Sequence, residues 1–396
     1  MRQIIVGGHA AGITANRYNC LMGGTVWNAT ENQVWAPIPT AGAIAKLRVK
    51  LSGNVAAGAT VTITLIVNSV ASALTATVTA GNAIAEDITH SVNVVAGDTV
   101  SLQVTTTGAP GALNAFWTTE FTATTAGASI FLCNINAWNG GTIYNRCQGV
   151  DASSQTINTY RAPMPTAGTF KNMYVVGSAG PGAGGDQFTI TLQKNGVNTS
   201  LSCVLVDAET TKNDTDDVAV IAANEMNFTI VPDNGPATSP YYGIGLTFIS
   251  STDGESVILY GDQTTFGANS YHHPGDASTS WQAAEADARA LVQGCTVKKL
   301  YISLYSALGV GSATFTVHIN GGATALAATV TDPATTGNDT VNSAVAGNGQ
   351  MISVRATVGG GAPSKIPRWG MVLLTTDAAK PRGGSAAGKL MTAGAI

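Results

Sequence analysis

The sequence repeats itself with a period of about 126 residues. One segment reads Ala36-Pro37-Ile38-Pro39-Thr40-Ala41-Gly42 and returns at residues 162–168 with a single change, Met164 for Ile38. A third, eroded copy ends at Gly294. A repeat of this length corresponds to a whole domain rather than to one turn of a solenoid. The fold therefore has to contain the same unit three times.

Further motifs recur at the same spacing and predict β-hairpins. In each copy an alternating apolar strand runs into a turn of the Asn-Gly type, the strongest short-range hairpin signal. The strands open at Val61, Phe188 and Phe315, and the turns are Asn68-Ser69, Asn195-Gly196 and Asn320-Gly321. The three copies therefore share their strand register.

Apolar and polar residues alternate throughout each copy, in segments rich in Val, Ile, Thr and Phe. This pattern predicts half-buried strands, and about eight strands per copy favour a two-layer antiparallel sandwich of jelly-roll or similar type. The predicted class is all-β, with three tandem β-sandwich domains. Equivalent positions should fill the cores: Ile44, Phe170 and Val297 in one layer, and Val61, Phe188 and Phe315 in the other.

The repeat also predicts the domain limits. We expect sandwich domains over residues 1–126, 127–252 and 253–378, followed by a C-terminal extension over residues 379–396. Residues 280–292 are rich in strong helix formers. However, Arg289-Ala290 aligns with Arg161-Ala162, which precedes a proline and is therefore extended. We predict a strand at Arg289-Ala290, with a helical turn allowed before it.

Composition limits the classes of function. Only 11% of the residues are charged, well below the ~25% usual for soluble domains. The surface therefore consists largely of Thr, Asn, Ser, Gly and Ala, which suits packing against neighbouring subunits. The net charge is −4 with no block of Lys or Arg, so no nucleic-acid partner is expected. No apolar run reaches the ~18 residues of a membrane span, so no membrane insertion is expected.

The first residues and the cysteines indicate the compartment. Arg2 followed by an apolar stretch is what a signal peptide would contain, but Ile4 takes the repeat position of Ile130 and Val257. We assign Ile4 to a first strand and expect synthesis in the cytoplasm without a signal peptide. Five cysteines form no C-x-x-C pair, and their odd number leaves at least one unpaired. We expect reduced, buried thiols.

No catalytic or cofactor-binding motif is present, so we expect neither an enzyme nor a cofactor. Weak candidates for metal ligands are His272, His273 and Asp276 in one turn, and Asp214 and Asp216 in an acidic loop. Adjacent His side chains on a strand point to opposite faces, and the acidic loop lacks the spacing of a calcium loop. Turns without metal are the favoured interpretation of both segments.

Several tryptophans have no counterpart in the other copies, among them Trp27, Trp138 and Trp281. If exposed, these three rings could stack on sugar rings or fill a partner's pocket. The alternative is that they fill a core or wedge two domains apart, which is favoured because Trp is buried on average.

Three segments resemble a known class of protein. They read W-A-P-I-P-T-A-G at residues 35–42, V-V-A-G-D-T-V-S-L at 94–102 and F-T-I-T-L-Q-K-N-G at 188–196. The pattern resembles the tandem β-sandwich modules of tailed-bacteriophage virion proteins, such as head decoration proteins, head fibres and tail fibres. The resemblance implies a non-enzymatic structural component of the virion. Its partners would be other copies of itself and other virion proteins.

Two other functions remain open. One is a receptor-binding protein that recognises a host-surface glycan. The other is a subunit of an extracellular filament or surface layer, which the lack of a signal peptide disfavours.

The C-terminal extension has the composition of a flexible linker and no counterpart in the other copies. We expect it to act as an assembly arm that docks on a neighbouring subunit. Its apolar anchors would be Leu390, Met391 and Ile396, and its cations Lys380, Arg382 and Lys389 would meet carboxylates.

Overall fold

The computed structural model describes residues 2–9, 12–13, 16–24, 27–136, 140–151, 155–156, 160–261, 264–275 and 281–375. The regular secondary structure of this part of the chain is almost entirely β. Within these ranges, the helical segments are two single 3-10 turns, η1 (Glu31–Gln33) and η3 (Glu285–Asp287). The predicted all-β class is confirmed.

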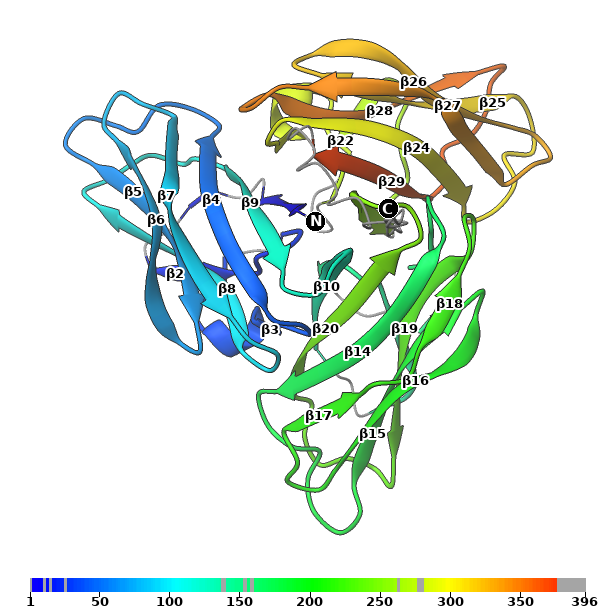
Figure 1. The fold of residues 1–396 in the computed structure, drawn as a ribbon. Helices are drawn as coiled ribbons and strands as arrows, with labels where there is room; N and C mark the ends of the chain where they lie inside the picture. The colour runs from blue at the N-terminus through cyan, green and yellow to red at the C-terminus, as the bar shows by residue number, and fades with distance from the viewer. Residues whose placement is uncertain are drawn as a thin grey trace, which may run out of the picture.

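The strands form six sheets, which pair into three sandwiches called here unit 1, unit 2 and unit 3 (Figure 1). Unit 1 contains β1 (Arg2–His9), β2 (Arg17–Asn19), β3 (Ala36–Pro37), β4 (Gly42–Leu51), β5 (Thr60–Val67), β6 (Val70–Thr79), β7 (Ile84–Val94), β8 (Thr99–Thr107) and β9 (Ala115–Ala123). Its sheets have the orders β1-β9-β4-β7 and β2-β8-β5-β6, and β3 pairs with β8.

This strand order is that of a jelly roll. With the two-residue β3 set aside and the other strands counted along the chain, the sheets of unit 1 read 1-8-3-6 and 2-7-4-5. Apart from the β5–β6 hairpin, successive strands cross from one sheet to the other, as in the double Greek key of a jelly roll. The apolar faces of both sheets therefore enclose a single core.

Units 2 and 3 repeat the arrangement. Unit 2 contains β10 (Ala128–Asn136), β11 (Ile143–Asn145), β12 (Gly149–Asp151), β13 (Ala162–Pro163), β14 (Gly168–Gly177), β15 (Gln187–Lys194), β16 (Val197–Val206), β17 (Thr211–Asp214), β18 (Val218–Val220), β19 (Glu225–Asp233) and β20 (Tyr241–Ser250). Unit 3 contains β21 (Glu255–Gly261), β22 (Ser270–His272), β23 (Ala290–Leu291), β24 (Cys295–Leu304), β25 (Ser312–Ile319), β26 (Gly322–Thr331), β27 (Thr336–Ala346), β28 (Met351–Gly359) and β29 (Pro367–Thr375). The edge strand that is continuous as β7 and β27 is split into β17 and β18 in unit 2.

The predicted register is confirmed by the cores. The six side chains expected in equivalent layers are all fully buried: Ile44, Phe170, Val297, Val61, Phe188 and Phe315. Strand β23 and the turn η3 before it also lie where the alignment of Arg289-Ala290 predicted an extended segment after a helical turn.

The three hairpins have the predicted turns. Both central residues of each turn have positive φ, at Asn68 and Ser69, Asn195 and Gly196, and Asn320 and Gly321. This is the requirement of a type I′ turn, whose twist matches that of the flanking strands.

The units close into a ring around a common centre (Figure 1). Strand β3 of unit 1 contacts β20 of unit 2, β13 of unit 2 contacts β29 of unit 3, and β23 of unit 3 contacts β9 of unit 1. The opening strand β1 contacts both β10 and β21, so the first strands of the three units meet near the centre. Consecutive units are linked by the chain, whereas unit 3 meets unit 1 through side-chain and backbone contacts alone.

Candidate functional site

The units meet where the proline-bearing strand of one crosses the last strand of the next. A Cβ atom built on Gly245 would lie 2.0 Å from the carbonyl oxygen of Pro37, and one built on Gly370 would lie 2.0 Å from that of Pro163. Only glycine allows another backbone to approach so closely. The repeated Ala-Pro-x-Pro motif is therefore the element by which unit 1 docks on unit 2 and unit 2 on unit 3.

The junction of units 3 and 1 has a different chemistry. Here β23 carries Leu291 in place of the proline, and the position equivalent to the two glycines is Thr118, which is buried and donates its hydroxyl to the carbonyl of Ile5 at 3.0 Å. Leu291 packs with Phe116 and Met351 in a small apolar cluster. Side-chain packing thus closes the ring where the proline–glycine contact is missing.

Buried amide side chains link the opening strands across the junctions. Gln3 Nε2 donates to the carbonyl of Ile130 and Gln3 Oε1 accepts from the amide of Ile130, both at 2.7 Å. Gln148 makes a similar pair of bonds to two residues: its Nε2 donates to Val257 O at 3.0 Å, and its Oε1 accepts from Leu259 N at 2.6 Å. Each glutamine side chain thus supplies the hydrogen bonds that a neighbouring strand would otherwise give to the backbone of the next unit. Since buried polar groups need their partners, these bonds fix the relative orientation of the units.

Glu255 is a fully buried carboxylate at the junction of units 2 and 3. It accepts hydrogen bonds from Thr166 Oγ1 at 2.6 Å, and ion pairs join it to Lys298 at 3.0 Å and Lys299 at 2.7 Å. Burial acts to raise the pKa of Glu255, but the hydrogen bonds from Lys299, Thr166 and Lys298 outweigh it and lower the pKa. Glu255 is therefore an ionised link between the loop of unit 2 and the sheet of unit 3.

A second polar network lies at the same junction. Ser303 donates its hydroxyl to Glu225 Oε1 at 2.5 Å, and Arg368 Nη2 donates to Ser303 Oγ at 3.0 Å. Arg368 lies 3.7 Å from Glu225 and Arg161 lies 4.0 Å from it. Burial lowers the pKa of Arg368. A cavity of about 340 Å³ opens beside this network.

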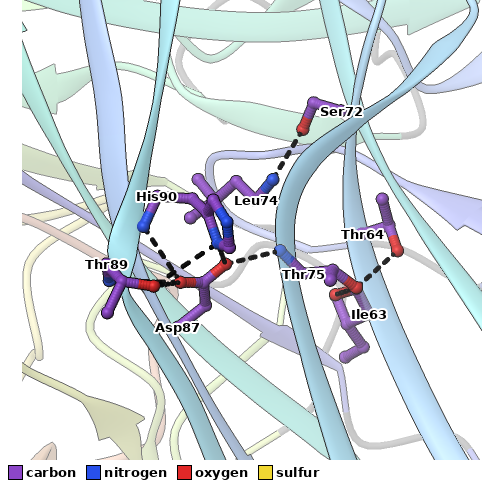
Figure 2. Close-up of polar contacts among 8 residues, drawn as sticks. All are labelled: Ile63, Thr64, Ser72, Leu74, Thr75, Asp87, Thr89 and His90. Atoms are coloured by element: carbon purple, nitrogen blue, oxygen red, sulfur yellow. Dashed lines mark hydrogen bonds and ion pairs between the residues drawn. The ribbon is translucent and has the colours of Figure 1, made fainter.

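One aspartate recurs in all three units and braces the sandwich edge. In unit 1, Asp87 of β7 accepts hydrogen bonds from the backbone amides of Thr75, Thr89 and His90 and from the side chains of Thr89 and His90 (Figure 2).

The equivalent aspartates of the other units make similar bonds. In unit 3, Asp339 accepts from the backbone amides of Ala327, Val341 and Asn342. In unit 2, Asp214 accepts from the backbone amides of Ser202 and Asp216. Each carboxylate thus joins the edge strand of one sheet to the neighbouring strand of the other sheet.

These bonds change the acidity of the aspartates. Burial acts to raise the pKa of Asp87, but the hydrogen bonds from Thr75, His90 and Thr89 hold it well below its usual range. The pKa of Asp339 is lowered by the equivalent bonds against the same effect of burial. Asp214, one of the two weak calcium candidates, accepts hydrogen bonds from the amides of Ser202 and Asp216 and is part of the brace.

The neighbouring histidines are buried and face different surroundings. His272 Nδ1 lies 2.8 Å from the carbonyl of His273, and its Nε2 lies 2.9 Å from the hydroxyl of Tyr260. His273 stacks against Phe116 of unit 1, with ring centroids 6.1 Å apart. The two rings therefore serve the core of unit 3 and its junction with unit 1 rather than a shared ion. Asp276 lies outside the described residues.

The structure describes two of the three candidate tryptophans, Trp27 and Trp281, and both contact core residues. Trp27 is buried against Trp117, and Trp281 packs on the core residues His272, Phe266 and Trp369 with part of its ring exposed. The favoured interpretation of Trp27 is confirmed, because its ring fills the core of unit 1 and is not exposed for stacking on a sugar. Trp138 and the six candidate residues of the C-terminal extension lie outside the described part of the chain.

All five cysteines are buried, and no disulfide joins them. Burial raises the pKa of Cys203 and Cys295 to about 12. Because the thiolate is the reactive form, these side chains behave as small apolar residues, as expected.

Comparison with known proteins does not identify a family for this chain. The chain matches no protein-family model, and no curated protein matches it. In the ranges the structure covers, no group of three or more His, Cys, Asp or Glu side chains could hold a metal ion. No helix among these residues is long and apolar enough to cross a membrane. The junctions between units are the features with the most specific chemistry.

Sequence reasoning missed the most informative residues of these junctions. Gly245 and Gly370 look like ordinary strand glycines until the proline strand of another unit is placed on them. The aspartate brace left a clearer signal, since Asp87, Asp214 and Asp339 recur close to the repeat spacing.

Proposed function

We propose that the protein is a non-enzymatic structural component of a bacteriophage particle, mounted on the capsid or the tail in contact with other virion proteins. The observation that supports this proposal best is the closed ring of three jelly rolls. Close backbone contacts and buried polar side chains hold the three units together as a ring with three similar faces. Jelly rolls are common among viral capsid proteins, which is support at the level of the fold alone.

A ring in one chain suits a site of threefold or near-threefold symmetry. Three similar faces can each meet an equivalent neighbour around such an axis. Covalent linkage of the units makes their association intramolecular, so the ring does not depend on protein concentration. The low content of charged residues, 11%, favours packing of this body against a neighbouring surface.

Copy number in purified particles tests the proposal. Particles are banded on a density gradient, and the chain is quantified by mass spectrometry against the major shell protein. We expect it to band with the particles at one fixed, high copy number in every preparation. Recovery of the chain only in the soluble fractions, or at a copy number that falls with each gradient, would contradict the proposal.

A truncated chain distinguishes the contribution of the ring to particle assembly from that of the C-terminal extension. Truncation after Thr376 keeps every described strand and removes the extension with Leu390, Met391 and Ile396. We expect this chain to fold but to be missing from particles, whereas the full chain expressed in the same way is incorporated. Normal incorporation of the truncated chain would rule out the assembly arm and leave the ring as the contact surface.

A further inference from the structure

The cavity at the junction of units 2 and 3 has the features of a ligand site. It is lined by Asn195 and Glu225 of unit 2 and by Tyr301, Ser303 and Asn338 of unit 3, among other residues. Its volume, about 340 Å³, lies at the lower end of the ~300–1,000 Å³ range of small-ligand pockets. It therefore has room for one or two rings of a small molecule.

One wall of the cavity is an aromatic ring beside an amide. Tyr301 of β24 and Asn338 of β27 are direct cross-strand partners, so both side chains lie on the same face of the sheet. Tyr301 is half-buried and Asn338 is exposed. The Asn338 amide has no hydrogen-bond partner among the described residues, so it can both donate to and accept from a ligand.

The opposite wall adds a second amide. Asn195 Oδ1 accepts a hydrogen bond from the backbone amide of Glu225 at 2.8 Å, which holds the side chain at the rim. Asn195 is exposed, and its Nδ2 group has no partner in the described part of the chain. Two amides from different units thus face the same space as the Tyr301 ring.

The charged groups beneath the cavity are already engaged. Glu225 accepts from Ser303 and lies within 4.0 Å of both Arg368 and Arg161. Arg368 is almost completely buried and also donates to the carbonyl of Leu304 at 3.0 Å. The cavity accordingly presents amides, hydroxyls and one ring, and lacks the uncommitted cation that a phosphate group would need.

The same pair of residues recurs at another junction. Tyr174 of β14 and Asn213 of β17 are cross-strand partners at the equivalent position of unit 2. A Cβ atom built on Gly97 of unit 1 would lie 4.0 Å from the Tyr174 ring, so this pair also faces a neighbouring unit. At the third junction an ion pair, Arg48 with Glu86, takes its place. An outward-facing Tyr–Asn pair therefore occurs at two of the three junctions.

We infer that the cavity between units 2 and 3 binds a saccharide. A pyranose ring has one face of C–H groups that packs on the negative face of an aromatic ring, here Tyr301. Its hydroxyls both donate and accept, and amides such as Asn195 and Asn338 match that pattern. This binding function is additional to the structural role and does not depend on it.

Binding by the isolated full-length chain tests the inference. The labelled protein is applied to an array of neutral and acidic glycans, and hits are measured in solution by saturation-transfer NMR and titration. We expect at least one glycan to bind. Comparison of the neutral with the acidic glycans on the array shows which class the site prefers. If the folded protein binds no glycan on the array, the inference is wrong.

Variants locate the site. Tyr301→Ala and Asn338→Ala should each weaken binding at least ten-fold, while Tyr301→Phe, which keeps the ring, should bind within a few-fold of the natural chain. Tyr144→Ala, a half-buried tyrosine on another sheet, is the matched control and should bind normally. Unchanged binding by folded Tyr301→Ala and Asn338→Ala would overturn the assignment, whether or not the chain is found in particles.

Discussion

Single residues determine whether the units can meet. Gly245 and Gly370 have no side chain at the points where the carbonyls of Pro37 and Pro163 lie 2.0 Å from a would-be Cβ atom. Where the proline is replaced by Leu291, the glycine is replaced as well, by Thr118. The two sides of each junction therefore vary together within one sequence.

Adding one methyl group should disrupt a junction. Gly245→Ala places a Cβ atom against the backbone of unit 1, which cannot move as a flexible side chain could. We expect a loss of stability of about 1–3 kcal/mol or more, measured by urea denaturation. Gly347→Ala is the control, because its nearest atoms would lie 3.7 Å away at ordinary contact distance. Equal stability of the two variants would contradict the close approach.

The aspartate brace should make stability depend on pH. The folded-state pKa of Asp87 is depressed, so its contribution is present above the ordinary Asp pKa of about 3.9 and declines as pH falls toward the folded-state value. Asp87→Asn should therefore lower stability at pH 7 and reduce the difference between pH 7 and pH 3. Asp216→Asn, an exposed aspartate, is the control. The same pH dependence in Asp87→Asn and the natural chain would contradict the brace.

At the scale of elements, paired threonines explain how an all-β surface can carry so little charge. Thr62 faces Thr77, Thr64 faces Thr75 and Thr314 faces Thr329 across neighbouring strands, with hydroxyl oxygens 2.8–2.9 Å apart. These pairs lie on exposed faces of β5–β6 and β25–β26. Cross-strand hydroxyl pairs stabilise a sheet without charge.

A double-mutant cycle measures one such pair. Thr64→Ala, Thr75→Ala and the double variant should show a coupling of about 0.2–1 kcal/mol. Thr62 with Thr75, which are not direct partners, provides the control cycle and should show less coupling. A coupling of zero for Thr64 with Thr75 would mean that the exposed pairs do not stabilise the hairpin.

Strands and hairpins could be predicted where the sequence pattern that indicates them is local. Alternation and the Asn-Gly turns predicted the hairpins, and alignment of Arg289-Ala290 with its counterparts predicted β23 against strong helix propensity. The Tyr301–Asn338 pair was not predictable, because the two residues become neighbours only through sheet pairing. The sequence around Asp214 predicts a solvated turn and not the brace, because the brace depends on the amide of Ser202 on another strand.

For the whole molecule, the sequence predicted three units but not their closure. The repeat shows that the three units have similar sequences, but similar units can also be arranged in a line without closing into a ring. Closure depends on contacts between units 3 and 1, such as the bond of Gln293 Nε2 to the carbonyl of Lys46 at 2.8 Å, for which the sequence carries no pattern. The virion role and the saccharide site both build on this ring, although each has its own test.

Small-angle X-ray scattering of the purified chain tests the ring most directly. We predict a monomer of 40.1 kDa with a radius of gyration near the roughly 21 Å of a compact body of this length, unchanged across a hundred-fold dilution. A clearly larger radius of the single chain, with the scattering profile of three separate bodies, would contradict closure of the three units within one chain.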